Sequence, residues 1–104
     1  MAQVRWTLTA VEDLRLLEEW IARDSPLNSV EFTDRLLAFV DSLELHPEVG
    51  RIVPEFNRSS IREMIFRGYR VVYSLESGTI HILRVVHGAR DLRGMAGREP
   101  WSFE

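Results

Sequence analysis

The sequence predicts an α+β domain: an N-terminal strand, then an antiparallel two-helix hairpin packed on a small antiparallel β-sheet. Two observations support this expectation. Apolar residues recur at helical spacing from about residue 10 to residue 43, and beyond Gly50 the chain becomes rich in β-branched and aromatic residues. The length of 104 residues favours one domain over 1–104, with a C-terminal tail at about 93–104.

A short strand and a first helix are expected at the start of the chain. Apolar and polar residues alternate around Val4 and Trp6, which is typical of a strand. Thr9 and Glu12 fit a capping box, so the helix is expected over about 10–23. The apolar residues at helical spacing are Val11, Leu14, Leu17 and Ile21, with Trp20 beside them.

A second helix is expected to begin at Ser25 and Pro26, which suit the N-cap and the first helical position. Pro47 and Gly50 end it. Because the link to the first helix is very short, the two helices should lie antiparallel. The apolar stripe of the second helix consists of Phe32, Leu36, Phe39, Val40 and Leu43.

Three antiparallel strands are expected in the second half of the chain. Tight turns are predicted at Gly68 and at Ser77-Gly78, because both lie between runs of strand-forming residues. An extended segment with Pro54 at an edge or in a loop precedes them. The predicted strands are 61–66, 69–75 and 79–87.

Composition excludes several classes of protein and site. The absence of cysteine excludes disulfides and thiolate chemistry. Apolar runs are short and the N-terminus lacks a signal pattern, so no membrane association and a cytoplasmic location are expected. His81 and His87 would lie about 20 Å apart on one strand, too far to share a metal. No phosphate-binding loop or nucleophile elbow is present, so no cofactor or metal is expected.

The charges divide unevenly along the chain, and all thirteen basic residues are arginine. Residues 1–50 hold four Arg and ten acidic residues, whereas residues 51–104 hold nine Arg and six acidic residues. Arginines on neighbouring strands could converge to bind carboxylates or phosphates. The alternative is that they provide solubility and pair with Glu55, Glu63 and Asp91. The arginines in question are Arg62, Arg67, Arg70, Arg84 and Arg90.

Several segments, in this order, resemble the motifs of ParE-type toxins. In the second half they are Gly50-Arg51-Ile52-Val53-Pro54-Glu55, Ile61-Arg62-Glu63, Tyr69-Arg70-Val71-Val72-Tyr73 and His87-Gly88-Ala89-Arg90-Asp91-Leu92. Thr9-Ala10-Val11-Glu12-Asp13-Leu14 and Asp24-Ser25-Pro26 agree in the first half. Each motif alone is weak, but their order and spacing are fairly specific. The resemblance covers about 3–93 and is to the ParE/RelE superfamily of type II toxin–antitoxin toxins.

This resemblance implies a RelE/ParE-like fold, in agreement with the periodicity. It implies a ParD-like antitoxin partner with a DNA-binding N-terminal half and a C-terminal half that wraps the toxin. The toxin itself is then not expected to bind DNA sequence-specifically. ParE-type members poison DNA gyrase, whereas the RelE branch cleaves messenger RNA on the ribosome. A third possibility is an antitoxin-binding module with little toxicity.

The residues favour gyrase inhibition over catalysis, so the chain is not expected to be an enzyme. Metal-free RNA cleavage needs acid–base groups and a cation for the phosphate. RelE-like enzymes resemble one another in often having a Tyr or His near the C-terminus, whereas no Tyr follows Tyr73 here. The segment from His87 to Leu92 instead looks like that of the gyrase-directed branch. An acid–base role for Tyr73 itself is the less favoured interpretation. If the chain were an RNase, its candidate residues would be Arg62, Arg70, Arg84 and His87.

Two contact surfaces are expected for the partners. A disordered antitoxin tail would fold on the toxin, placing apolar residues along the hairpin and acidic residues on the sheet arginines. The residues expected to bind the antitoxin are Arg62, Arg67, Arg70, Leu17, Trp20 and Phe39. The residues expected to bind the target are Arg90, Arg93, Arg98 and Trp101, in a tail that is either docked or exposed.

Overall fold

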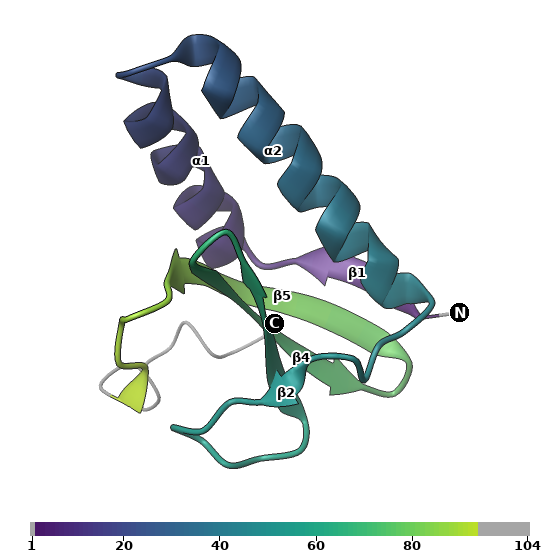
Figure 1. Cartoon of the computed structure of the whole chain (residues 1–104). Coiled ribbons are helices and arrows are strands. Elements are labelled where there is room, and N and C mark those ends of the chain that lie inside the picture. Colours follow the sequence, from purple (N-terminus) through teal and green to yellow (C-terminus); the bar gives the residue numbers. More distant parts are fainter. Residues whose placement is uncertain (1, 94–104) are drawn as a thin grey trace.

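The computed structural model describes residues 2–93, and in it two helices stand on one face of a five-stranded sheet (Figure 1). The free end of the hairpin extends beyond the sheet in this view. The α+β class predicted from the sequence is therefore confirmed. The elements are β1 (Gln3–Trp6), α1 (Leu8–Ala22), α2 (Pro26–Asp41), the 3-10 helix η1 (Ser42–Glu44), β2 (Arg51–Ile52), β3 (Ile61–Phe66), β4 (Tyr69–Glu76) and β5 (Thr79–His87).

The sheet has the strand order β1-β5-β4-β3-β2 and is mixed rather than wholly antiparallel. Strands β2 to β5 pair antiparallel, but β1 runs parallel to β5, with Val4 opposite Ile80 and Trp6 opposite Ile82. The three antiparallel strands predicted in the second half are confirmed, and the structure adds the N-terminal strand to their sheet in parallel. The hairpin carries the chain away from β1, so the strand that later pairs with β1 can take either direction.

The first helix begins two residues earlier than predicted, because Thr7 and not Thr9 is its N-cap. The Thr7 hydroxyl accepts a hydrogen bond from the Ala10 N–H at 3.0 Å, which satisfies one free donor of the first turn. Glu12 takes no part in a capping box and instead pairs with Arg15 at 2.7 Å. The helix therefore follows β1 directly, with one residue between them.

The second helix is capped as the sequence predicts. Ser25 accepts from the Asn28 N–H at 3.2 Å, and Pro26 occupies the first turn. Phe39 is half-buried, with its ring 5.1 Å from that of Phe66 on β3. On α1, Val11 is 49% exposed, contrary to its expected place on the inner face, and Ala10 is buried there instead. The rest of the stripe on the second helix and η1 is buried as expected: Phe32, Leu36, Val40 and Leu43.

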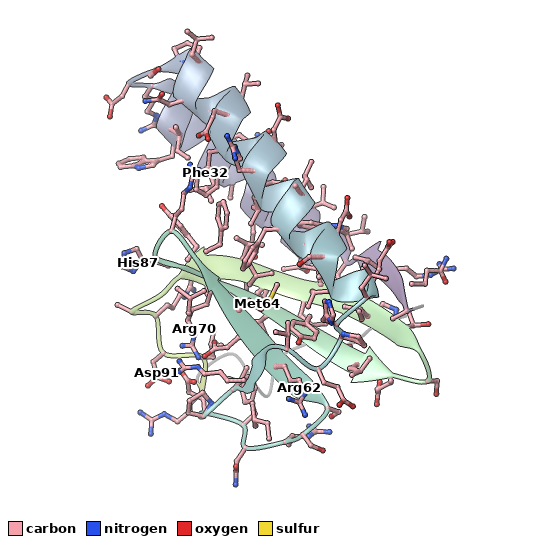
Figure 2. All side chains as sticks on the ribbon, turned by 45° about the vertical axis from the view of Figure 1, so that its right-hand side comes forward. Phe32, Arg62, Met64, Arg70, His87 and Asp91 are labelled. Carbon is pink, nitrogen blue, oxygen red and sulfur yellow. The ribbon has the colours of Figure 1, made fainter. Side chains whose placement is uncertain are left out.

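Apolar side chains fill both faces of the sheet. The larger cluster lies between the hairpin and the sheet, where Phe32 projects toward the strands (Figure 2). The smaller cluster lies on the opposite face and joins the loop after β2 to the residues after β5: Val53, Ile61, Val72, Leu83, Val86 and Leu92. Because β4 and β5 have core on both sides, the sheet is a rigid platform for the segments at its ends.

Both predicted hairpin turns are present, and each places two consecutive residues at positive φ. Arg67 and Gly68 have φ of 48° and 85°, and Ser77 and Gly78 have φ of 52° and 77°. Positive φ at both central residues is the pattern of type I′ turns, which match the twist of the adjoining strands. No helix within residues 2–93 is both long and apolar enough to cross a membrane.

Candidate functional site

A chain of ion pairs crosses the face of the sheet opposite the helices. Arg51 on β2 donates Nε–H to Glu63 Oε2 at 2.6 Å, and Arg70 on β4 donates Nε–H to Glu63 Oε1 at 2.6 Å. Arg70 then donates through Nη1 and Nη2 to both carboxylate oxygens of Glu55, each at 2.7 Å. Glu63 and Arg70 are buried, so these charges compensate one another inside the fold.

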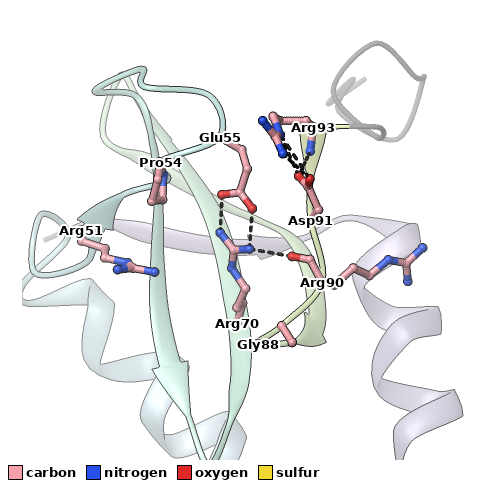
Figure 3. Close-up of a pocket in the computed structure, with 9 residues that line it drawn as sticks. Arg51, Pro54, Glu55, Arg70, Gly88, Arg90, Asp91 and Arg93 are labelled. Atoms are coloured by element: carbon pink, nitrogen blue, oxygen red, sulfur yellow. Dashed lines mark hydrogen bonds and ion pairs between the residues drawn. The ribbon is translucent and has the colours of Figure 1, made fainter.

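This network also holds the segment that follows β5. Arg70 Nη1 donates to the carbonyl oxygen of Arg90 at 2.8 Å, and Glu55 Oε2 accepts from the Leu92 N–H at 3.2 Å. Figure 3 shows Arg70 between the Glu55 carboxylate and the Arg90 backbone. We call Glu55 and Arg70, together with these two backbone contacts, the Glu55–Arg70 clamp.

Electrostatics keep the clamp ionised at neutral pH. The hydrogen bonds from Arg70 are the main reason that the pKa of Glu55 falls from its ordinary 4.5 to about 2, against the opposing effect of burial. The same contacts raise the pKa of Arg70. Arg70 makes four hydrogen bonds to other residues of the described range, so its charge is already matched before any partner arrives.

A pocket of about 670 Å³ opens beside the clamp, between β2, β4 and residues 88–93 (Figure 3). The guanidinium group of Arg90 points away from it, and no hydrogen bond or ion pair holds that side chain among residues 2–93. Arg93 pairs with Asp91 at 2.7 Å, and the pair is largely exposed. The hydrogen bond from Arg93 lowers the pKa of Asp91 to about 2. Arg90 and Arg93 are thus the two exposed arginines of this segment.

The remaining candidate arginines do not converge with Arg70, contrary to the expectation of one anion-binding face. Arg62 lies opposite Tyr73, which faces the helices, whereas Arg70 lies opposite Ile65 on the other side. Arg62 donates to the carbonyl oxygens of Glu48, Gly50 and Ser59. Arg67 pairs with Glu31 on α2, and Arg84 pairs with Asp13 on α1.

Each of these arginines therefore joins segments of the chain itself. The alternative interpretation, pairing within the chain, is right for Arg70 with Glu55 and Glu63. Asp91, the third expected partner, pairs instead with Arg93, which was not among the arginines considered. The sequence could not show this, because the partner of each arginine depends on which strands are neighbours and in what register.

His87 and Tyr73, the two candidate acid–base residues, are in different surroundings. His87 is exposed at the end of β5, accepts from the Ala89 N–H at 3.2 Å, and packs its ring against Tyr69. Tyr73 is fully buried, and burial raises the pKa of its hydroxyl. That hydroxyl donates to the Pro47 carbonyl oxygen and accepts from the Gly50 N–H. Tyr73 is a structural residue here.

The residues expected to contact an antitoxin differ in exposure. Trp20 is 63% exposed near the free end of the hairpin, with the guanidinium of Arg23 5.3 Å from the centre of its ring. Leu17 and Phe39 are partly buried. The sequence reasoning missed an outer stripe on α2, although its i, i+3, i+10 spacing was a usable signal. The stripe consists of Leu27, Val30 and Leu37, which are 82%, 60% and 38% exposed.

Two of the expected target-binding residues, Arg98 and Trp101, lie outside the described residues. Within residues 2–93, no group of three or more His, Asp or Glu side chains is arranged to hold a metal ion. The site that the structure does describe is thus a positively charged C-terminal segment held against a buried charge network.

A family model for the ParE toxin of the type II toxin–antitoxin system parDE matches residues 4–92. The chain belongs to the ParE toxin family. It is the toxin of a type II toxin–antitoxin system within the ParE/RelE superfamily, as the resemblance of its motifs implied.

A curated relative and two solved structures agree with this assignment. Toxin RelE2 of Caulobacter vibrioides is 36% identical over 91 residues, covering 86% of this chain and 99% of the relative. The chromosomal ParDE system of P. aeruginosa has a similar fold, with a TM-score of 0.70 at 18% identity, covering 84% of this chain and 96% of that one.

The second solved structure is the toxin–antitoxin complex RelBE2 of Mycobacterium tuberculosis. Its TM-score is 0.57 at 24% identity, covering 83% of this chain and 96% of that one. At these identities the two structures support the fold, while the family rests on the sequence match.

Proposed function

We propose that this toxin arrests growth in the cytoplasm by binding DNA gyrase directly, and that a ParD-like antitoxin neutralises it. The observation that carries the proposal is the state of the candidate RNase arginines. Arg70 and Arg84 are paired with carboxylates inside the chain, and Arg62 is bonded to backbone carbonyls. None of the three is left as a free cation for a scissile phosphate, which such cleavage requires.

In this proposal, the toxin contacts its target through residues 88–93 and the tail beyond them, rather than through the paired arginines of the sheet. Arg90 and Arg93 are exposed, and they are presented by a backbone that the Glu55–Arg70 clamp holds in place. A rigidly presented cationic segment suits protein recognition, because little conformational entropy is lost when it binds. The matching family model is that of the parDE toxin, which also favours gyrase as the target.

The antitoxin assignment has its own support. The two similar solved structures come from a ParDE system and a RelBE2 complex, in which a toxin is paired with an antitoxin. On this chain the hairpin presents exposed apolar residues, including Trp20, Leu27 and Val30, to an amphipathic partner. Such a partner would cover apolar surface that is otherwise left in water.

The test is a gyrase assay with the purified toxin, with and without its antitoxin. We expect loss of supercoiling and accumulation of cleaved DNA, both reversed by the antitoxin. The double variant Arg90→Ala with Arg93→Ala should lose the effect while still binding the antitoxin. A toxin that stops growth but leaves gyrase untouched contradicts the proposal. Expression without any growth defect would instead indicate an antitoxin-binding module.

Ribosome-dependent RNA cleavage is the second candidate, favoured by the name of the relative, Toxin RelE2, and by the exposure of His87 beside β4. Primer extension on translated messenger RNA after induction separates the two mechanisms. Cleavage that disappears in a His87→Ala variant would replace the gyrase proposal. Intact messages during growth arrest would remove this candidate.

A further inference from the structure

We propose that Glu55 is a positioning residue for the toxic contact, because with Arg70 it fixes residues 88–93 so that Arg90 and Arg93 are presented to the target. This inference rests on the proposed role of these two arginines in binding the target. The loop between β2 and β3, which carries Glu55, would then fix the backbone of residues 88–93, which Arg90 and Arg93 cannot do themselves.

The contacts show why residues 88–93 need an external anchor. β5 ends at His87, and the described residues after it, 88–93, are not paired with a neighbouring strand in the sheet. Near the start of the segment, the Gly88 N–H donates to the Gly68 carbonyl oxygen at 2.8 Å. Further along, both polar anchors end on the clamp: the Arg90 carbonyl on Arg70 and the Leu92 N–H on Glu55.

The two clamp contacts lie between the two functional side chains, Arg90 and Arg93, along the chain. The Arg90 carbonyl and the Leu92 N–H bracket Asp91, which in turn pairs with Arg93. The side chain of Leu92 is fully buried beneath the segment, so backbone and side chain are held at the same point. Fixing this backbone therefore sets the directions in which Arg90 and Arg93 leave it.

Glu55, rather than Arg70, is the residue whose role can be isolated. Arg70 also holds the buried Glu63, so its removal would take an arginine from two carboxylates at once and would leave Glu63 with the exposed Arg51. Glu55 lies in a loop with its side chain 15% exposed, and without it Arg70 keeps its bond to Glu63. Loss of Glu55 should free the C-terminal segment while leaving the sheet intact.

The experiment uses the full chain with Glu55→Gln and Glu55→Ala, and Glu12→Ala as a matched control. Glu12 also binds an arginine, Arg15, through both carboxylate oxygens, but on the exposed surface of α1. Amide hydrogen exchange gives a readout that does not depend on the target. We expect the Leu92 amide in Glu55→Ala to exchange at least about tenfold faster, while the Val71 and Val85 amides keep their protection.

Growth inhibition at matched expression and gyrase inhibition by the purified proteins give the functional readout. We expect Glu55→Ala to lose about tenfold in potency, because Arg90 and Arg93 must then be ordered on binding. Glu55→Gln should lose less, since its amide oxygen can still accept from the Leu92 N–H. Antitoxin affinity should stay within about twofold, which excludes general unfolding as the cause.

The failure of this inference is distinguishable from the failure of the proposed function. Faster Leu92 exchange with unchanged potency would show that the segment need not be fixed, and would overturn the positioning role. Unchanged Leu92 exchange would show that Glu55 does not hold the segment, with the same consequence. If the wild type spares gyrase but still stops growth, the proposed target falls, and the loss of growth inhibition in Glu55→Ala still tests the positioning role.

Discussion

Arg84 on β5 and Asp13 on α1 form a two-point ion pair, with Nε–Oδ2 at 2.8 Å and Nη2–Oδ1 at 3.0 Å, although 71 positions separate them. Asp13 Oδ2 also accepts from the Val85 N–H at 2.9 Å. β1 pairs with β5 only as far as Ile82, so Asp13 satisfies a backbone donor on the edge that β1 leaves open. The pair joins the hairpin to the sheet at this edge.

Replacing Asp13 by Ala should lower the free energy of unfolding by about 3 kcal/mol, because it leaves a poorly exposed Arg84 charge and the Val85 N–H without an acceptor. Urea denaturation at neutral pH measures this loss. Glu19→Ala, which removes an exposed ion pair of Arg15, should change stability by less than about 0.5 kcal/mol. Equal effects of the two variants would mean that the Asp13 pair contributes no more than a surface contact.

The Tyr73 hydroxyl and the Gly50 N–H form a buried hydrogen bond, so substitution of either residue should destabilise the fold. Tyr73→Phe should cost about 1–3 kcal/mol, since the Gly50 N–H and the Pro47 carbonyl lose their partner. A Cβ at Gly50 would lie 2.6 Å from the Tyr73 hydroxyl oxygen and 2.7 Å from the Glu63 carbonyl oxygen, so Gly50→Ala should cost about 2 kcal/mol or more.

The control for Tyr73 is Tyr69, a half-buried tyrosine on the same face of β4. No hydrogen bond of the Tyr69 hydroxyl is found among residues 2–93, so Tyr69→Phe should stay within about 0.5 kcal/mol of the wild type. Thermal unfolding compares the two. A loss in Tyr69→Phe as large as that in Tyr73→Phe would show that the hydroxyl contacts of Tyr73 are not the cause.

The fold was predictable because apolar residues recur along the chain at helical spacing in the helices and at alternate positions in the strands. The bounds of β3 and β5 and the start of α2 follow from local patterns and caps that do not depend on distant residues. The cap of α1 is different. Thr7 and Thr9 both precede an apolar run, so the sequence alone does not show which of them caps the helix. Thr7 also donates to the carbonyl oxygens of Ile82 and Leu83, and these acceptors are in reach only once β5 is in place beside it.

The candidate site was less predictable for the same reason. Arg62 and Arg70 lie on adjacent strands, but Arg62 is opposite Tyr73 and Arg70 opposite Ile65, so they leave the sheet on opposite faces. Spacing along one strand gives the parity of its side chains, not the register of its neighbour. The partners of these arginines, such as Glu55 in a loop, are set by that register.

The Glu55–Arg70 clamp should make stability fall in acid over a defined range. The pKa of Glu55 is lowered from 4.5 to about 2 in the fold, so its contribution is complete above about pH 4.5 and is lost as pH falls toward about 2. Denaturation of the wild type and Glu55→Gln should differ by about 2 kcal/mol at neutral pH and converge at about pH 2. A gap that persists in acid would assign the difference to packing rather than charge.

Ser77 occupies a turn position that suits Asn better. Its φ is 52°, followed by Gly78 at 77°, and Asn-Gly is the preferred pair for a type I′ hairpin. Ser77→Asn should raise the free energy of unfolding by about 0.5 kcal/mol, whereas Ser77→Val should lower it by about 1–2 kcal/mol, because a β-branched residue resists positive φ. Thermal unfolding of both variants checks the sign. Destabilisation by Asn would mean that this turn is not of the I′ type.

Trp20 gives the clearest test of where the antitoxin binds, since Leu17 and Phe39 are partly buried and their truncation would mix binding with stability. Trp20 is 63% exposed, so Trp20→Ala should leave the unfolding free energy within about 0.5 kcal/mol of the wild type. An aromatic anchor at an interface contributes about 2 kcal/mol or more, so the antitoxin Kd should rise about 30-fold. Titration calorimetry measures it.

The control for Trp20 is Val49, which is also 63% exposed but lies between η1 and β2, away from the hairpin. Val49→Ala should leave the antitoxin Kd within about twofold of the wild type, because Val49 lies outside the two helices that the antitoxin is proposed to cover. A larger loss of antitoxin affinity in Val49→Ala than in Trp20→Ala would indicate that the antitoxin binds the segment before β2 rather than the helices. In that case the outer stripe of α2, with Leu27 and Val30, would need another partner.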